Sequence, residues 1–164
     1  LKIKALNKHI QTISITEESI NPKKNETPEQ RNLRRWNKYV ARIKEAFAKS
    51  QPKNIQESAV DIFRSCLFWT WAVFSRECYS TSCGTTENAR VAASILAIIN
   101  SKLVDVGKNT ILYTLYRIKN GLHHGSKHDV EKGSIFIAEC YRQRLVSSQL
   151  MVQILIELLE GQRK

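Results

Sequence analysis

The chain has 164 residues and a formal net charge of +11, from 26 basic and 15 acidic side chains. This length fits one domain, and its core can be large enough to fold without a disulfide or a structural metal. Only six glycines and three prolines occur, which argues against disorder, collagen-like repeats and loop-rich β folds.

The first residues differ in composition from the rest of the chain. Residues 1–26 are polar with scattered isoleucines, and we predict an extended arm there. Thr27, Pro28 and Gln30 then form a capping-box pattern with proline at the first helical position. We therefore expect a helical domain over 27–164.

The first predicted helix is amphipathic and basic. Apolar residues follow one another at steps of three and four, as on one face of a helix, at Leu33, Trp36, Val40, Ile43 and Phe47. The opposite side carries basic residues, at Arg31, Arg35, Lys38, Arg42 and Lys49. The segment Ser-Gln-Pro at 50–52 is expected to end this helix.

Two further helices are predicted before residue 80. Asn54 and Glu57 form a second capping pattern, and the helix that follows should extend to about Cys66. A third apolar segment runs from about Phe68 to Tyr79. We expect its tryptophans, Trp69 and Trp71, to pack in the core or between helices rather than to stack on nucleic-acid bases.

Four more helices follow, each after a residue that can cap it. The expected caps are Thr85 or Thr86, Asp105, Asp129, and Ser147 or Ser148. The first of these helices ends near Asn100, and its alanines suggest close approach to its neighbours. Gly121 and Gly125 mark a predicted hinge-like, solvated loop, LHHGSKHD at 122–129, which contains His123, His124 and His128.

The pattern as a whole indicates an all-α fold. No strand-like alternation and no Asn-Gly or Asp-Gly hairpin signal occurs. Helices joined by short connections pack antiparallel, and stacked hairpins of this kind form an α-solenoid. The stretch Asn-Ser-Lys at 100–102, followed by Gly107, is then a tight corner between two helices.

Motifs for catalysis or metal binding are lacking. The sequence has no glycine-rich phosphate loop, no G-x-S-x-G and no H-E-x-x-H, so we expect no catalytic residues, no cofactor and no enzyme. The C-x4-C pair at Cys78 and Cys83 is weak support for zinc, and all four cysteines are expected to be free thiols. No signal peptide is visible at the start of the sequence.

Several segments resemble one known family, the middle domain of initiation factor 4G in its spliceosomal, nucampholin-type version. The similar segments are WNKYVARIKEAFAKSQPKNI from Trp36, DIFR from Asp61, IINSK followed by Val106 and Gly107, and FIAECYRQRLVSSQLMVQILIELLE from Phe136. The resemblance covers about three quarters of the chain, without an obvious gap. It implies a HEAT-like solenoid, of which this chain is the N-terminal part.

The resemblance also implies a partner. The family binds one lobe of a DEAD-box helicase of the initiation factor 4A type and holds that helicase open and inactive. In the family, the contact with the helicase includes the end of the first helix, which has a Gly followed later by Asn-Lys. This sequence has Glu45 and Ala48 in place of the Gly and the Asn, and Lys49 matches the Lys. The expected helicase-binding residues on one rim of the solenoid are Glu45, Lys49, Lys53, Asn54, Asn100, Ser101 and Lys102.

Two other functions remain open at this point. The excess positive charge has two interpretations. It indicates either an acidic partner, which is RNA or an acidic protein face, or a basic surface that only keeps the protein soluble. A generic RNA-binding HEAT-like module would contact phosphates through Arg31, Arg35, Lys38 and Arg42. A translation or ribosome-biogenesis factor could have the same fold. The spliceosomal version fits best and implies a nuclear protein of the exon junction and splicing machinery, with spliceosome core proteins, snRNA or pre-mRNA as further partners.

Overall fold

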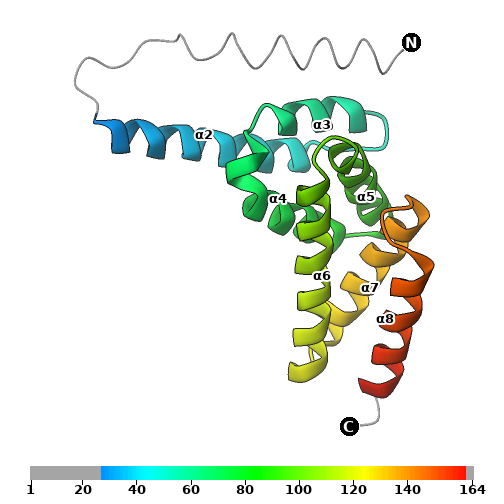
Figure 1. The fold of residues 1–164 in the computed structure, drawn as a ribbon. Coiled ribbons are helices and arrows are strands. Elements are labelled where there is room, and N and C mark those ends of the chain that lie inside the picture. The colour runs from blue at the N-terminus through cyan, green and yellow to red at the C-terminus, as the bar shows by residue number, and fades with distance from the viewer. Residues whose placement is uncertain (1–26, 162–164) are drawn as a thin grey trace.

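The computed structural model describes residues 27–161, so the predicted arm at 1–26 lies outside the described residues. The described part folds into seven α-helices with no β-strand, which confirms the all-α prediction (Figure 1). No helix in this range has the length and apolar content needed to cross a membrane. The helices are α2 Pro28–Ala48, α3 Ile55–Phe63, α4 Leu67–Ser82, α5 Thr86–Asn100, α6 Val104–His124, α7 Lys127–Arg142 and α8 Ser148–Gly161.

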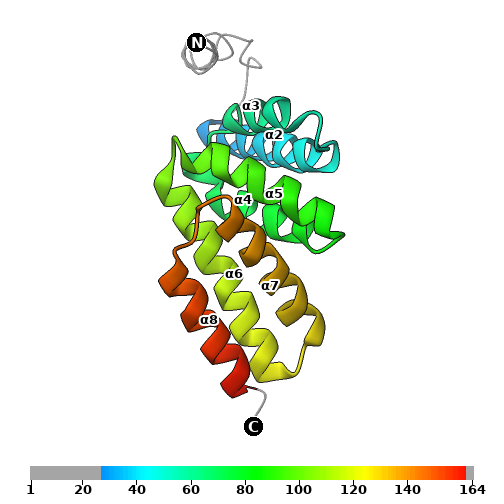
Figure 2. The same ribbon diagram turned by 90° about the vertical axis from the view of Figure 1, so that its right-hand side faces the viewer.

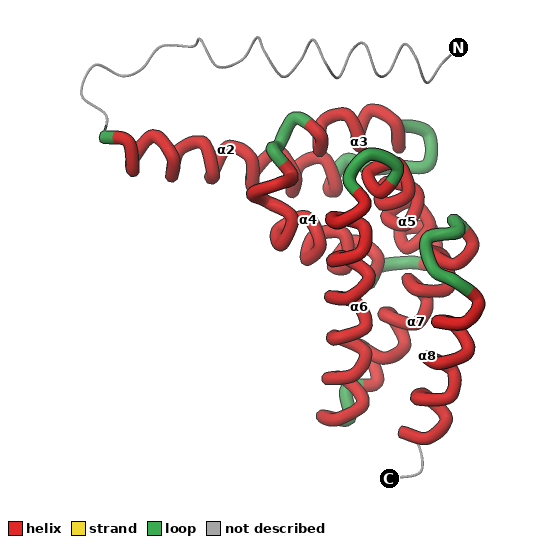
Figure 3. The backbone as a smooth tube through the Cα atoms, in the orientation of Figure 1, coloured by secondary structure: helices red, strands yellow, loops and turns green. Residues whose placement is uncertain are grey.

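The helices form antiparallel hairpins that stack on one another. Helices α2, α4 and α6 pack in sequence along one layer, while α3, α5 and α7 form the second layer. Figure 3 shows that only short loops join them, and Figure 2 shows the hairpins following one another from α2 and α3 down to α6 and α7. The predicted α-solenoid is therefore confirmed.

Helix α5 lies at the centre of the packing. It contacts α3, α4, α6 and α7, and six of its side chains are fully buried. The buried residues are Ala89, Ala92, Ala93, Ile95, Leu96 and Ile99. Alanine at three of these positions lets neighbouring backbones come close, as the sequence predicted.

Two predicted helix starts are confirmed in detail. The Thr27 hydroxyl accepts the Gln30 N–H at 3.3 Å, and the Gln30 side chain accepts the Thr27 N–H at 3.1 Å, so the capping box is complete. Thr85 caps α5 by accepting the Asn88 N–H at 3.2 Å. Both caps satisfy backbone donors that have no partner within the helix.

The predicted caps of α6 and α7 are wrong by two or three residues. Leu103 is the N-cap of α6, and Ser126 is the N-cap of α7, where its hydroxyl accepts the Asp129 N–H at 3.4 Å. Asp105 and Asp129 lie instead in the first turns of these helices. A carboxylate there is favoured by the helix dipole, so it marks a helix start without being the cap.

The predicted hinge loop at 122–129 is largely helical. Helix α6 continues to His124, and only Gly125 and Ser126 separate it from α7. Gly125 has φ +67°, a left-handed conformation that glycine adopts without penalty and that commonly ends a helix. The connection is thus a tight turn and not a hinge.

One polar cluster joins three helices. A terminal nitrogen of Arg117 on α6 donates to both carboxylate oxygens of Asp129 on α7, at 2.9 and 3.0 Å. Tyr79 on α4 donates its hydroxyl to Asp129 at 3.2 Å, and the Arg117 guanidinium lies 5.5 Å from the centre of the Tyr79 ring. Hydrogen bonding to Arg117 lowers the pKa of Asp129 below its usual value.

The corner between α5 and α6 depends on Gly107. A Cβ atom built on Gly107 would lie 2.0 Å from Oδ1 and 2.8 Å from Cβ of Asn100. The Asn100 side chain thus occupies the space that any larger residue at 107 would need. The spacing between the Asn-Ser-Lys stretch and this glycine therefore has a steric cause.

We expect the Gly107→Ala substitution to destabilise the fold by roughly 2–3 kcal/mol, because the added methyl group overpacks against Asn100. Gly125→Ala is the matched control, since its added Cβ meets no atom within 4 Å. It should cost only about 1 kcal/mol, for the left-handed backbone. Urea unfolding followed by circular dichroism measures both. Equal stabilities of the two variants would contradict the steric explanation.

We also expect the Asp129→Asn substitution to lower the free energy of unfolding by about 1–2 kcal/mol at pH 7. Because the pKa of Asp129 is lowered in the folded state, the stabilisation by its ionised carboxylate is complete at pH values above the pKa of the unfolded chain, near 3.9. It is lost as the pH falls through the folded-state pKa. The stability difference between wild type and variant should therefore shrink below about pH 4.

Glu131→Gln is the control for this experiment, because Glu131 is an exposed carboxylate on the same helix. Urea unfolding at a series of pH values should show little difference between this variant and wild type. A stability difference for Asp129→Asn that stays constant down to pH 2 would contradict a role for the ionised carboxylate.

Candidate partner-binding surface

The end of α2 and the turn into α3 form an exposed corner. Lys49 is the C-cap of α2, and Asn54 is the N-cap of α3. Glu45, Lys49 and Lys53 are all exposed. The structure thus brings together four of the residues that the resemblance assigned to helicase binding.

Glu45 and Lys49 form an ion pair one helical turn apart. Their side chains keep 63% and 69% of their surface exposed. The hydrogen bond between them lowers the pKa of Glu45 and raises the pKa of Lys49, so both stay charged. The two charges compensate each other, which leaves Lys53 as the remaining exposed cation of the predicted site on this corner.

Asn54 is the N-cap residue of α3, but its side chain bonds to the preceding turn instead of to the helix. Its side-chain amide donates to the Lys49 carbonyl at 2.9 Å, and its side-chain oxygen accepts the Gln51 N–H at 2.6 Å. It makes no capping hydrogen bond to α3, so the predicted capping box with Glu57 is wrong. Asparagine side chains often bond to nearby backbone in this way, and here the backbone of the preceding turn is the partner.

The second predicted group of residues lies at the corner between α5 and α6. Asn100 is half-buried with its side chain against Gly107, and Ser101 donates its hydroxyl to the Ile98 carbonyl at 2.7 Å. Lys102 is exposed. The observed roles of Asn100 and Ser101 are therefore in shaping the corner itself.

These two corners do not share one rim, contrary to the prediction. Figure 2 shows the turn between α2 and α3 at the right-hand end of the helices and the turn between α5 and α6 at the left-hand end. The physical reason is the alternation of antiparallel helices. Turns within a hairpin lie on one edge of the solenoid, and turns between successive hairpins lie on the other.

The basic stripe, defined as Arg31, Arg35, Lys38 and Arg42, follows one side of α2. Arg31 and Lys38 are exposed and Arg35 is half-exposed. Arg42 donates to the Arg64 carbonyl at 2.8 Å, so it also holds the turn between α3 and α4 against α2. The exposed charge therefore lies mainly on the N-terminal half of the helix.

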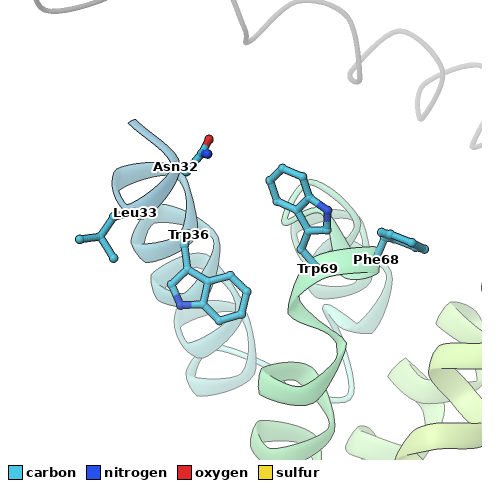
Figure 4. A pocket seen from close by; sticks show the side chains of 5 residues that line it. All are labelled: Asn32, Leu33, Trp36, Phe68 and Trp69. Carbon is cyan, nitrogen blue, oxygen red and sulfur yellow. The ribbon is translucent and has the colours of Figure 1, made fainter. Parts of the chain in front are cut away.

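An aromatic groove between α2 and α4, on the other side of α2 from this stripe, was missed in the sequence. The groove has a volume of about 650 Å³ and is lined by Asn32, Leu33, Trp36, Phe68 and Trp69 (Figure 4). The prediction that Trp69 and Trp71 pack inside is wrong, since 53% and 42% of their surfaces are exposed. Thr70, between them, takes the buried position on α4.

The histidines and cysteines form no metal site in the described residues, where no group of three or more potential ligands is close enough. His123 and His124 end α6, while His128 belongs to the first turn of α7. Cys78 is fully buried with its thiol 3.8 Å from the Ala92 carbonyl, and burial raises its pKa. All four cysteines are free thiols, as predicted.

Comparison with known proteins gives two curated relatives. A protein named pre-mRNA-splicing factor CWC22 from Candida albicans is 28% identical over 127 residues, which cover 77% of this chain and 20% of the relative. A protein of the same name from Debaryomyces hansenii is 26% identical over 142 residues, covering 87% of this chain and 22% of the relative. No family model matches the chain.

The matched region includes most of the described helices, whereas the chain spans about a fifth of the length of the curated relatives it matches. The nucampholin-type resemblance predicted from the sequence is confirmed by these relatives and by the all-helical fold. The chain is thus similar, over most of its own length, to part of the pre-mRNA-splicing factors named CWC22.

Proposed function

We propose that this chain is a non-enzymatic scaffold of the spliceosome that acts in pre-mRNA splicing in the nucleus. The observation that carries this proposal is the similarity to two proteins named as pre-mRNA-splicing factors, over 127 and 142 residues. The helical solenoid supports it, because stacked hairpins offer long surfaces for partners.

We further infer that the partner is a DEAD-box helicase of the initiation factor 4A type. The corner between α2 and α3 is the better contact surface of the two, because Glu45, Lys49 and Lys53 project there together. Asn100 and Ser101 on the other edge are engaged within their own corner. A helicase lobe that docks on the first corner need not reach the second.

Binding one lobe is sufficient to control such an enzyme. A ligand shifts a conformational equilibrium only by its different affinities for the two states. A scaffold that grips one lobe in an orientation incompatible with closure therefore stabilises the open, inactive helicase. The basic stripe of α2 would then face an acidic protein surface or RNA of the same assembly.

Charge reversal at the corner tests the proposed helicase contact. We expect Lys49→Glu with Lys53→Glu to weaken binding of an initiation-factor-4A-like helicase, without ATP, by about tenfold or more. The physical reason is that a second acidic residue would then lie beside Glu45 and repel an acidic partner. Pull-down followed by isothermal titration calorimetry measures the change.

The control reverses the same number of charges on the opposite edge, with Lys102→Glu and Lys108→Glu, both exposed positions. This variant should bind the helicase as wild type does. Loss of binding in the control but not in the test variant would move the contact to the corner between α5 and α6. Capture of no helicase by wild type would contradict the proposed partner.

A further inference from the structure

The apolar stripe of α2 is covered along only part of its length. Helix α3 has nine residues while α2 has 21, and the N-terminal half of α2 projects beyond the rest of the described fold (Figure 1). Ile43 and Phe47 are buried, whereas Leu33 and Trp36 are 61% and 37% exposed. Residues 27–161 therefore cover the first half of the stripe only in part.

The start of α4 adds two aromatic side chains to this open surface. Phe68 and Trp69 keep 85% and 53% of their surface exposed to solvent. Figure 4 shows the indoles of Trp36 and Trp69 on either side of the space between α2 and α4. The groove between the two helices has a volume of about 650 Å³, which is enough for several side chains of an occupant. Exposed apolar surface of this kind marks an interaction site.

The groove favours an apolar occupant over a charged one. Four of its five lining side chains are aliphatic or aromatic, and the fifth is Asn32. The basic stripe lies on the other side of α2, and the Arg76 guanidinium on α4 is paired with Glu77 at 3.8 Å. Aliphatic side chains that fill the groove would remove both indoles from water, which is the main gain available there.

The sequence directly before α2 supplies such side chains. The segment 13–20, Ile-Ser-Ile-Thr-Glu-Glu-Ser-Ile, has three isoleucines among eight residues. The link from this segment to Thr27 is Asn-Pro-Lys-Lys-Asn-Glu at 21–26, and an Asn-Pro pair favours the start of a turn. The sequence therefore combines an apolar segment with a polar link that can reverse the chain direction along α2.

The length of the link permits this contact. Leu33 and Trp36 lie six and nine residues after Thr27, which is about 9 and 14 Å along the helix axis. Ile20 lies seven residues before Thr27, and a link of this length spans up to about 23 Å. Ile20 can therefore reach the whole α2 side of the groove, and the residues before it can extend to the start of α4.

We propose that the segment 13–20 docks in the aromatic groove of its own chain. Its three isoleucines pack between Trp36 and Trp69 and exclude water from the two indoles. Because the segment is tethered to α2, its concentration at the groove is on the order of millimolar, so modest apolar contacts hold it there. Another ligand reaches the groove only by displacing the segment, which therefore controls access to this end of α2.

This inference goes beyond the proposed helicase contact and does not depend on it. The groove lies at the start of α2, and Lys49 lies about 20 Å further along the helix axis. Lys49→Glu with Lys53→Glu should therefore leave the segment docked, and release of the segment should leave helicase binding unchanged. Each proposal can fail while the other holds.

Tryptophan fluorescence of the full chain provides the first test, because two of its three tryptophans flank the groove. We expect the variant with Ile13→Asp, Ile15→Asp and Ile20→Asp to emit at longer wavelength than wild type. Its quenching by acrylamide should rise about twofold, since water and quencher then reach both indoles. Circular dichroism verifies that the helices remain folded.

The matched control introduces the same three charges earlier in the sequence, with Ile3→Asp, Leu6→Asp and Ile10→Asp. This control should emit and be quenched as wild type is. Equal emission and quenching in wild type and in both variants would overturn the proposal. A wild-type emission that shifts with protein concentration would also overturn it, because it would assign the segment to the groove of a second copy.

Limited proteolysis tests the contact from the side of the groove. Trypsin cleaves after Lys23 and Lys24, in the link that docking holds at both ends. Trp69→Ala should speed this cleavage severalfold, whereas Trp71→Ala, at a 42% exposed position on another side of α4, should not. Combining Trp69→Ala with the three isoleucine substitutions should have no more effect than either change alone. A cleavage rate that Trp69→Ala leaves unchanged would overturn the proposal.

Discussion

Burial of α5 on four sides is the constraint on which the rest of the fold depends. Every other helix that touches it must bring an apolar face, and the alanines of α5 determine how closely those faces approach. The hairpins therefore pack around the buried helix α5 and do not simply lie side by side. Both corners discussed above are fixed because the helices that enter them pack on α5 or on its direct neighbours.

The surface features arise where this packing stops. Helix α3 is too short to cover α2, so the same apolar stripe that builds the core at Ile43 and Phe47 reaches solvent at Leu33 and Trp36. The difference in helix length thus leaves an open aromatic surface at the start of α2, on the other side of the helix from the basic stripe. The proposed helicase contact and the aromatic groove then lie at opposite ends of α2.

Much of the fold could be predicted from the sequence because helix periodicity and caps are local. The capping box at Thr27 and the hydroxyl cap at Thr85 depend on residues within one turn, and both are confirmed. The exposure of Trp69 could not be predicted, because it depends on where α3 ends and therefore on distant packing. One signal was available: two tryptophans two residues apart cannot both lie on the buried stripe of α4.

The placement of the candidate site was predictable only in part. The residues of each corner are neighbours in sequence, so their grouping at 45–54 and at 100–102 followed from the helix boundaries. Whether the two groups meet depends on which edge each turn occupies. Because successive helices alternate in direction, the turn between α2 and α3 and the turn between α5 and α6 lie on opposite edges of the solenoid, so the two groups of residues are separated.

The ion pair between Glu45 and Lys49 has a consequence for kinetics. Opposite charges one turn apart form a short dipole whose field decays within a few ångströms, so this pair exerts no long-range attraction on an approaching protein. Electrostatic attraction at this corner then comes from the single charge of Lys53, so the encounter rate there should vary only weakly with ionic strength. The exposed Arg31 and Lys38 near the start of α2 lie in the most basic part of this helix, so attraction of a negatively charged partner to that end would depend more strongly on ionic strength.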